Sequence, residues 1–99
     1  PLGCMVVSAT GALSEDHSLL SEWLMQQRTR RTRGIVERMQ QAAEAGQLLA
    51  GTDTESLGNY YATVLHGLSV QARDGVSREA LYPVVRCSLL LLQSTRTPE

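Results

Sequence analysis

The sequence has few aromatic residues and almost no net charge, and both shortages exclude classes of protein. Aromatic residues make up 4% of the 99 positions, with no phenylalanine and one tryptophan. A core must therefore be built mainly from Leu, Val, Ala and Met, which is typical of helical bundles. The formal net charge of −1 differs from that of a domain that binds nucleic acid by itself, which is usually clearly basic. We expect any contact with DNA to come from residues outside this chain.

Cysteines and long apolar runs are also scarce. Cys4 and Cys87 are far apart and lack the spacing of metal ligands, which indicates two reduced, buried thiols in a cytoplasmic protein. We expect no disulfide, no metal site and no cofactor. The longest apolar run, Leu89 to Leu92, is too short to cross a bilayer. No basic region precedes an apolar one at the N-terminus, so the pattern predicts a soluble chain with no membrane partner.

The chain is short and starts abruptly. Pro1 is followed almost at once by an apolar run, with no initiator Met and no capping residue before it. This start indicates a segment cut from a longer protein. A domain of this size buries a smaller fraction of its surface than a larger one does, so a partner subunit would help to stabilise it.

Helical periodicity with matching caps predicts an all-α domain over residues 1–94, followed by a disordered tail at 95–99. We expect four helices in an antiparallel arrangement, at about 3–13, 17–45, 53–74 and 77–93. A capping box at Thr52 to Glu55 begins the third helix and Gly75 ends it. Ser77 caps the fourth helix, in which Pro83 predicts a kink or a late start.

The fourth helix is apolar on nearly every side. Val84, Val85 and Leu92 lie on the side of the helix that we expect to pack into the core of its own domain. Leu89 and Leu90 lie on other sides and are apolar as well. A domain this small cannot bury all of these side chains. The pattern therefore predicts that a helix from another subunit covers the rest.

Short motifs in a fixed order carry a family resemblance. The sequence has GCMVV, then a capped long helix ending in EAGQL, then a helix carrying HGLSVQARDGVS, then the last helix. From about Gly3 to Leu92 it resembles the C-terminal effector-binding and dimerisation domain of TetR/AcrR-type transcription regulators. The resemblance implies a bacterial, ligand-responsive regulator without catalytic activity, a repressor released from DNA by a small-molecule effector.

The resemblance also implies the partners. The protein would form a homodimer through a four-helix bundle made of residues 53–74 and 77–93 of both copies. The effector would be apolar or aromatic. Operator DNA would be bound only through an N-terminal helix-turn-helix headpiece, which this chain lacks. The alternative is a stand-alone helical dimerisation or protein-interaction module with no ligand, and sequence upstream of Pro1 would distinguish the two.

Two sets of residues are candidates for these roles. Effector pockets combine aromatic or flexible side chains with a few polar groups, and ordinary core is the alternative for each residue. The candidate ligand-binding residues are Met5, Ser8, Trp23, Met39, Tyr61 and His66. The candidate dimer-interface residues are Tyr60, Thr63, Gly67, Val70 and Gln71, which flank the core stripe of the third helix, and Val85, Leu89 and Leu92 on the fourth helix. Gly58 and Gly67 are costly within a helix unless backbones approach closely, and we expect that approach at the dimer interface.

Other polar residues suggest less specific roles. His17 and His66 have no metal-binding or nucleophilic partner at a suitable spacing, so no catalytic residue is expected. The arginine-rich segment 28–33 would spread around a helix rather than form one face that reads DNA, and a solvated surface is the favoured interpretation. Many relatives of the resembled family are apolar there, so Arg28 and Arg31 could mark a bend, face solvent or line a polar pocket.

Overall fold

A computed structural model describes residues 18–98 as three helices joined by short loops. These are α2 (Ser18–Glu44), α3 (Thr54–Arg73) and α4 (Arg78–Thr95). The prediction of an all-α fold is confirmed over these residues, and each helix lies within about two residues of its predicted bounds. The helix expected at 3–13 lies outside the described residues, as do the candidate ligand-binding residues Met5 and Ser8.

The ends of α3 and α4 are set by side-chain caps. The Asp53 carboxylate accepts a hydrogen bond from the Ser56 backbone N–H, with a distance of 3.0 Å, so Asp53 is the N-cap of α3. The predicted capping box, which paired Thr52 with Glu55, is wrong, because the Thr52 hydroxyl donates to the Leu49 carbonyl in the preceding turn (2.6 Å). Gly75, at φ +90°, follows α3 as predicted.

The start of α4 is also fixed by its cap. Ser77 Oγ accepts from the Ala80 backbone N–H at 3.2 Å. The helix therefore begins at Arg78 with Pro83 inside it, and a late start is excluded. Because proline has no N–H, one hydrogen bond of the early helix is missing there.

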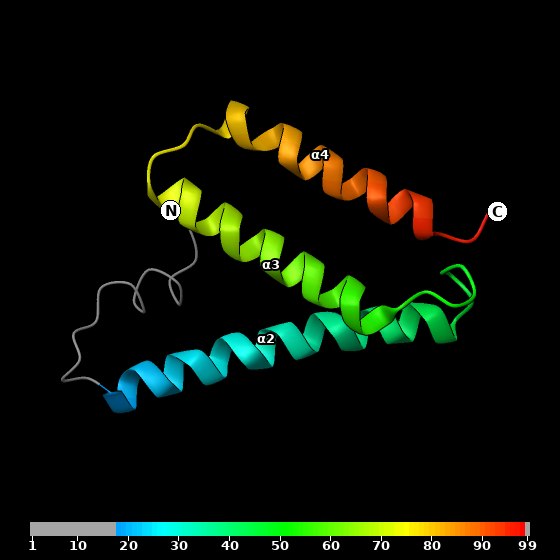
Figure 1. The fold of residues 1–99 in the computed structure, drawn as a ribbon, viewed down its shortest axis with the longest axis horizontal. Coiled ribbons are helices and arrows are strands. Elements are labelled where there is room, and N and C mark those ends of the chain that lie inside the picture. Colours follow the sequence, from blue (N-terminus) through cyan, green and yellow to red (C-terminus); the bar gives the residue numbers. More distant parts are fainter. Residues whose placement is uncertain (1–17, 99) are drawn as a thin grey trace.

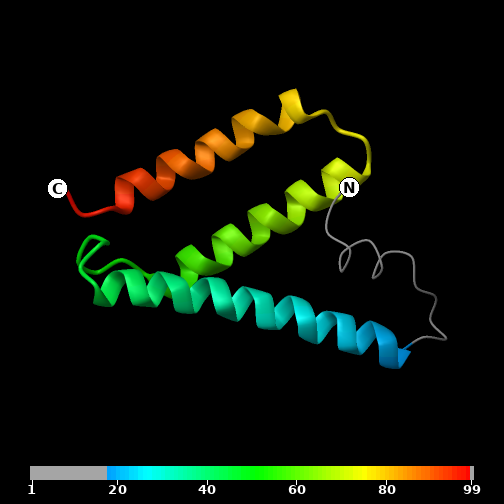
Figure 2. The ribbon, with the colours of Figure 1, turned by 180° about the vertical axis from the view of Figure 1, so that it is seen from behind.

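The three helices form one layer in which α3 lies between α2 and α4 (Figure 1). The N-terminal end of α3 lies against α2, and the two helices diverge toward the C-terminal end of α3, as Figure 2 shows from behind. α4 runs back beside α3 in the opposite direction, but α3 packs far more extensively against α2 than against α4. One face of α4 is therefore left largely uncovered.

The crossing of α2 and α3 depends on a glycine. A Cβ placed on Gly58 would lie 2.6 Å from Cγ2 and 2.7 Å from Cα of Val36. Val36 is fully buried and Gly58 is buried beside it. The close approach expected for Gly58 therefore exists, but it joins two helices of one chain, so its assignment to the dimer interface is wrong. Nothing lies within 4 Å of the corresponding position on Gly67, whose role in a dimer stays a prediction.

The segment after α4 is held in place by the loop between α2 and α3. The Leu49 N–H donates to the Thr95 carbonyl (2.8 Å) and the Thr97 N–H donates to the Gln47 carbonyl (2.9 Å), around an antiparallel bridge between Leu48 and Arg96. The Thr97 hydroxyl also donates to the Gly46 carbonyl (2.8 Å). The prediction of a disordered tail at 95–99 is thus wrong for residues 95–98, because a loop distant in sequence supplies their backbone partners.

The buried core is small and much apolar surface is exposed. The buried apolar side chains are Leu24, Val36, Leu48 and Leu57. The large apolar residues exposed by more than a third are Leu19, Leu20, Trp23, Met25, Leu49, Tyr60, Leu65, Val76, Tyr82, Val84, Val85, Leu89, Leu90 and Leu91. Six of them lie on α4. So large an apolar surface indicates a site of interaction with other protein.

Candidate functional site

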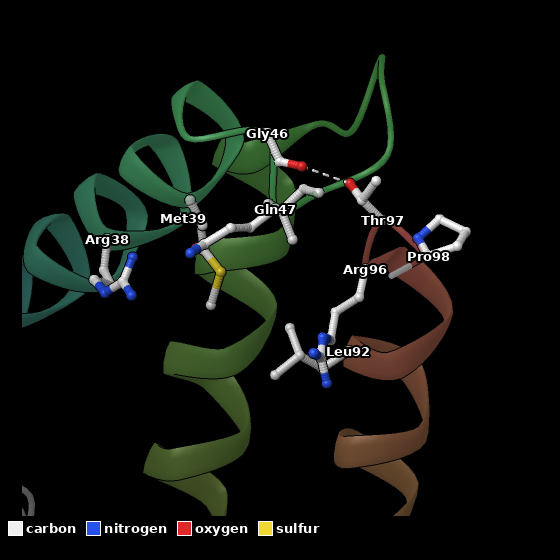
Figure 3. Close-up of a pocket in the computed structure, with 10 residues that line it drawn as sticks. Arg38, Met39, Gly46, Gln47, Leu92, Arg96, Thr97 and Pro98 are labelled. Carbon is white, nitrogen blue, oxygen red and sulfur yellow. Dashed lines mark hydrogen bonds between the residues drawn. The ribbon is translucent and has the colours of Figure 1, made fainter.

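One pocket lies where the C-terminal ends of α2 and α4 meet the loop between α2 and α3, and we call it the C-terminal pocket. Its volume is about 560 Å³, within the range of about 300–1,000 Å³ found for small-molecule sites. Figure 3 shows α2 and α4 on either side of it, with the hydrogen bond from Thr97 to Gly46 at one edge. It is lined by Arg38, Met39, Ala42, Gly46, Gln47, Leu48, Leu92, Arg96, Thr97 and Pro98.

The C-terminal pocket combines apolar and basic side chains. Met39 and Leu92 contribute apolar surface from α2 and α4, while Arg38 contributes a guanidinium from α2 (Figure 3). Met39 is a candidate ligand-binding residue, and its place here is compatible with that role. Leu92, a candidate dimer-interface residue, lines the same pocket.

A second pocket of about 210 Å³ lies between α2 and α3, and we call it the α2–α3 pocket. It is lined by Arg28, Arg31, Thr32, Asn59, Ala62, Thr63 and His66. α2 is continuous past Arg28 and Arg31, so the bend, one of the three alternatives for these arginines, is not accompanied by a break in the helix. Both line this pocket, and Arg31 is also exposed to solvent. The expected solvated surface holds for Arg30, Arg31 and Arg33, which are exposed, while Arg28 is half-buried. Arg33 forms an ion pair with Glu55 (2.6 Å).

The four candidate ligand-binding residues that the structure describes do not line one pocket. Met39 and His66 line different pockets. Trp23 is 53% exposed and lines neither of them. Met5 and Ser8 lie outside the described residues. Reasoning from the spacing of apolar residues selects side chains that can line a pocket, but it does not show where two helices diverge.

Tyr61 connects α3 to α4. Its hydroxyl donates to the Ser88 carbonyl (2.6 Å), and its ring meets that of Tyr60 edge to face, with centroids 5.1 Å apart. Burial, followed by the neighbouring Tyr60, raises the pKa of Tyr61, and the Leu92 backbone amide partly opposes this. Tyr61 therefore holds the helix pair together in this structure, and its hydroxyl is engaged by protein.

The candidate dimer-interface residues lie on α3 and α4 and most of them are accessible. Tyr60 is 40% exposed, Val85 37% and Leu89 51%. Thr63 and Gln71 are exposed, and Gly67 and Val70 are half-buried. Thr63 also lines the α2–α3 pocket. These residues are available for an interface, and the interface itself remains a prediction.

Five residues that line the α2–α3 pocket are in neither set of candidate residues, although the sequence analysis gave a polar pocket as one alternative for the two arginines. They are Arg28, Arg31, Thr32, Asn59 and Ala62. A signal was present for the arginines, because they interrupt an apolar stripe that resumes at Ile35. Asn59 carried no such signal, since one asparagine on a helix is ordinary and only the crossing with α2 brings it opposite Arg28.

Metal sites and membrane-spanning helices are both absent from residues 18–98. In this part of the chain no group of His, Cys, Asp and Glu residues is arranged to hold a metal ion. None of the described helices is long and apolar enough to span a membrane.

The chain is similar to solved structures of CifR, a TetR family transcriptional regulator complexed with 26-base-pair double-stranded operator DNA. A triple cysteine mutant of CifR is 42% identical over 90% of this chain, with a TM-score of 0.81. A double cysteine mutant is 43% identical over 90% of it, also with a TM-score of 0.81. The chain spans about half the length of these relatives, 46% and 47%. Neither a protein-family model nor a curated protein matches it.

Proposed function

Because the chain belongs to the TetR family of transcriptional regulators, we propose that it is the ligand-sensing and dimerising part of such a regulator. The observation that carries this proposal is the 42% identity to CifR over 90% of the chain, together with the shared arrangement of helices. The relatives are regulators rather than enzymes, so the proposal includes no catalytic step.

The uncovered face of α4 supports the dimerising role. Leu89 and Leu90 are 51% and 64% exposed on a helix that α3 covers on one side only. Burying one leucine contributes roughly 1.5–3 kcal/mol, so several leucines on each copy would drive association. We propose a two-fold symmetric homodimer in which α3 and α4 of both copies form a four-helix bundle.

The pockets support the sensing role. A small molecule bound between helices can change the geometry of the regulator only if it has different affinities for two arrangements of those helices. Both pockets lie between helices rather than on one helix, so occupancy is coupled to how the helices pack. Through the dimer, this change would alter the distance between DNA-binding headpieces that lie outside this chain and would release operator DNA.

Light scattering behind a sizing column tests the proposal. The 99-residue chain should elute with the mass of two copies at micromolar concentration, because a monomer would leave the α4 leucines in water. A chain that stays monomeric at high micromolar concentration would remove the dimerising role from the proposal.

A further inference from the structure

We propose that the C-terminal pocket binds an uncharged, apolar small molecule that contacts α2 and α4 at once. This inference rests on the ligand-sensing role proposed above, and it assigns that role to one pocket and one chemical class of ligand. It follows from where the pocket lies, what its walls are made of and which of its polar groups are already engaged.

The first argument is the position of the pocket between two helices that do not pack against each other. The backbones of α2 and α4 do not approach one another, and α4 packs only sparsely against α3. Met39 of α2 and Leu92 of α4 nevertheless line the same pocket and point into the space between the two helices (Figure 3). A molecule in this pocket would therefore link α4 to α2 directly.

The second argument is the apolar character of the walls. Leu48 is 8% exposed, and Met39, Ala42 and Leu92 are half-buried. All four line the pocket. The unbranched methionine side chain adapts its shape to a neighbouring apolar group, and an apolar ligand gains free energy as its surface leaves water. The walls therefore favour an apolar ligand.

The third argument is that hydrogen-bond donors along one edge of the pocket are engaged within the protein. The Gln47 N–H donates to the Ala42 carbonyl (2.9 Å), and the Thr97 N–H donates to the Gln47 carbonyl (2.9 Å). The Thr97 hydroxyl donates to the Gly46 carbonyl (2.8 Å), and Pro98 has no N–H. A ligand that needed these donors would have to break bonds that hold the segment after α4 in place.

The charges around the pocket disfavour an ionised ligand. None of the described lining residues is acidic, so a cation would meet no counter-charge, and an unpaired charge is costly to remove from water. Arg96 already interacts with other groups of the protein. Arg38 is exposed, and ion pairs at exposed side chains contribute little. An uncharged ligand is therefore the best match.

The volume of the pocket indicates the size of the ligand. An apolar cavity of about 150 Å³ holds one benzene ring, and the C-terminal pocket has about 560 Å³. Two fused rings therefore fit, with room for a substituent. 2-Naphthol is a suitable probe because it has two fused rings and is uncharged at neutral pH.

A titration of the ¹⁵N-labelled chain with 2-naphthol tests the site. We expect saturable chemical-shift changes centred on residues 38–48 and 92–98, with a dissociation constant on the order of 0.1–1 mM for so small a probe. The cation 2-naphthylmethylammonium should bind at least about tenfold more weakly, because it would carry an unpaired charge into the pocket.

Two outcomes of these titrations would contradict the inference. Shift changes centred on the exposed face of α4, rather than on the residues around the pocket, would overturn the site. Tighter binding of the anion 2-naphthoate than of 2-naphthol would overturn the assignment to uncharged ligands.

Ala42→Trp places a bulky ring in the pocket, so it should weaken the binding of 2-naphthol at least about tenfold. Gln41→Trp is the matched control, because Gln41 is the neighbouring residue on α2, is exposed and lines no part of this pocket. It should change the affinity less than about twofold. Equal affinity in the wild-type chain and a folded Ala42→Trp variant would contradict binding in this pocket.

A second variant keeps the test decisive if Ala42→Trp unfolds. Met39→Gln keeps the length of the side chain and replaces its thioether by an amide, which loses water when an apolar ligand covers it. It should weaken binding about fivefold while circular dichroism stays helical. Absence of saturable binding to the wild-type chain, or unchanged affinity in Met39→Gln, would overturn the inference.

Light scattering on the same samples separates this inference from the proposed function. A dimer that does not bind 2-naphthol would overturn the ligand site and leave the dimerising role intact. A monomer that binds 2-naphthol saturably would support the site and speak against the dimer.

Discussion

At the scale of single residues, two side chains determine how α3 is held between its neighbours. Gly58 allows the backbone of α3 to approach that of α2 at Val36, and Tyr61 connects α3 to α4 through Ser88. Both act within one chain, although the sequence suggested a dimer interface for the first and a ligand contact for the second. Each can be tested by removing or adding a few atoms.

Gly58→Ala should destabilise the chain by about 1–3 kcal/mol, the usual cost of overpacking a well-packed contact. The new methyl group would lie 2.7 Å from Cα of Val36, and a backbone atom cannot move aside by changing a rotamer. The measurement is urea unfolding followed by circular dichroism.

The control for this substitution is Gly34→Ala. Gly34 lies inside α2 with nothing within 4 Å of the added Cβ, so alanine should stabilise the helix by up to about 1 kcal/mol through its higher helix propensity. If both variants were stabilised, the close approach of α2 and α3 at Gly58 would be contradicted.

Tyr61→Phe should cost about 0.5–1.5 kcal/mol, the net contribution of one hydrogen bond, measured by the same unfolding experiment. Burial raises the pKa of Tyr61 above its ordinary value of 10.0. The contribution of the protonated hydroxyl is therefore fully present below pH 10 and is lost as the pH rises through the raised pKa.

The dependence of stability on pH shows whether the hydrogen bond of the Tyr61 hydroxyl stabilises the fold. The difference in unfolding free energy between the wild-type chain and Tyr61→Phe should shrink above pH 10. Tyr82→Phe, at a tyrosine that is 50% exposed, should leave the wild-type profile unchanged. A difference between wild type and Tyr61→Phe that stayed constant up to pH 12 would refute the role of the Tyr61 hydroxyl.

At the scale of helices, side-chain caps fix where α3 and α4 begin, and hydrogen bonds from a loop fix the C-terminal end of α4. Asp53 and Ser77 accept backbone N–H groups at the starts of α3 and α4. The C-terminal end of α4 is secured differently, because Thr95 and Thr97 pair with the loop that follows α2. The loop between α2 and α3 therefore both caps one helix and holds another.

The Asp53 cap predicts a specific dependence on pH. Hydrogen bonds from the Ser56 backbone and from the Ser56 hydroxyl lower the pKa of Asp53 below its ordinary value of 3.8. A lowered pKa in the folded state means that this contribution is present above pH 3.8 and is lost as the pH falls through the lowered pKa.

Asp53→Asn isolates this effect, because asparagine is also a good N-cap but does not titrate. The thermal midpoint of the wild-type chain should fall more between pH 5 and pH 2.5 than that of Asp53→Asn. Parallel profiles for the two proteins would show that the Asp53 carboxylate does not stabilise α3.

At the scale of the whole molecule, the described residues form a layer with a small core and a large exposed apolar surface. Four apolar side chains are buried, while fourteen large ones are exposed by more than a third. Covering that apolar surface with a second copy would stabilise the chain. We therefore expect its stability to depend on its own concentration, as it does for dimers whose folding and association are coupled.

The thermal midpoint should rise with protein concentration in the wild-type chain. Leu89→Glu places a charge on the exposed face of α4, so it should abolish the dependence on concentration and give a monomer in light scattering. Arg30→Ala, at an exposed residue of α2, should leave both properties unchanged. A concentration-independent midpoint for the wild-type chain would contradict assembly through α4.

The amino-acid sequence by itself determined the helices, their approximate bounds and the family. Caps, glycines and apolar periodicity act within a few residues of one another, so they can be read without knowledge of the fold. The sequence also showed that α4 has apolar residues on nearly every side, more than one small domain can bury. That argument requires only the sequence of one helix.

The tertiary structure alone decided which helices touch and where. Three features join segments at least 22 residues apart: the contact of Gly58 with Val36, the pairing of residues 95–97 with 47–49, and the pocket that Arg28 lines together with Asn59 and His66. Periodicity identifies the side of a helix that is apolar, but it does not identify the helix that covers that side or the angle at which they cross. The polar pocket arises from the divergence of α2 and α3, and that divergence is a property of packing rather than of either helix alone.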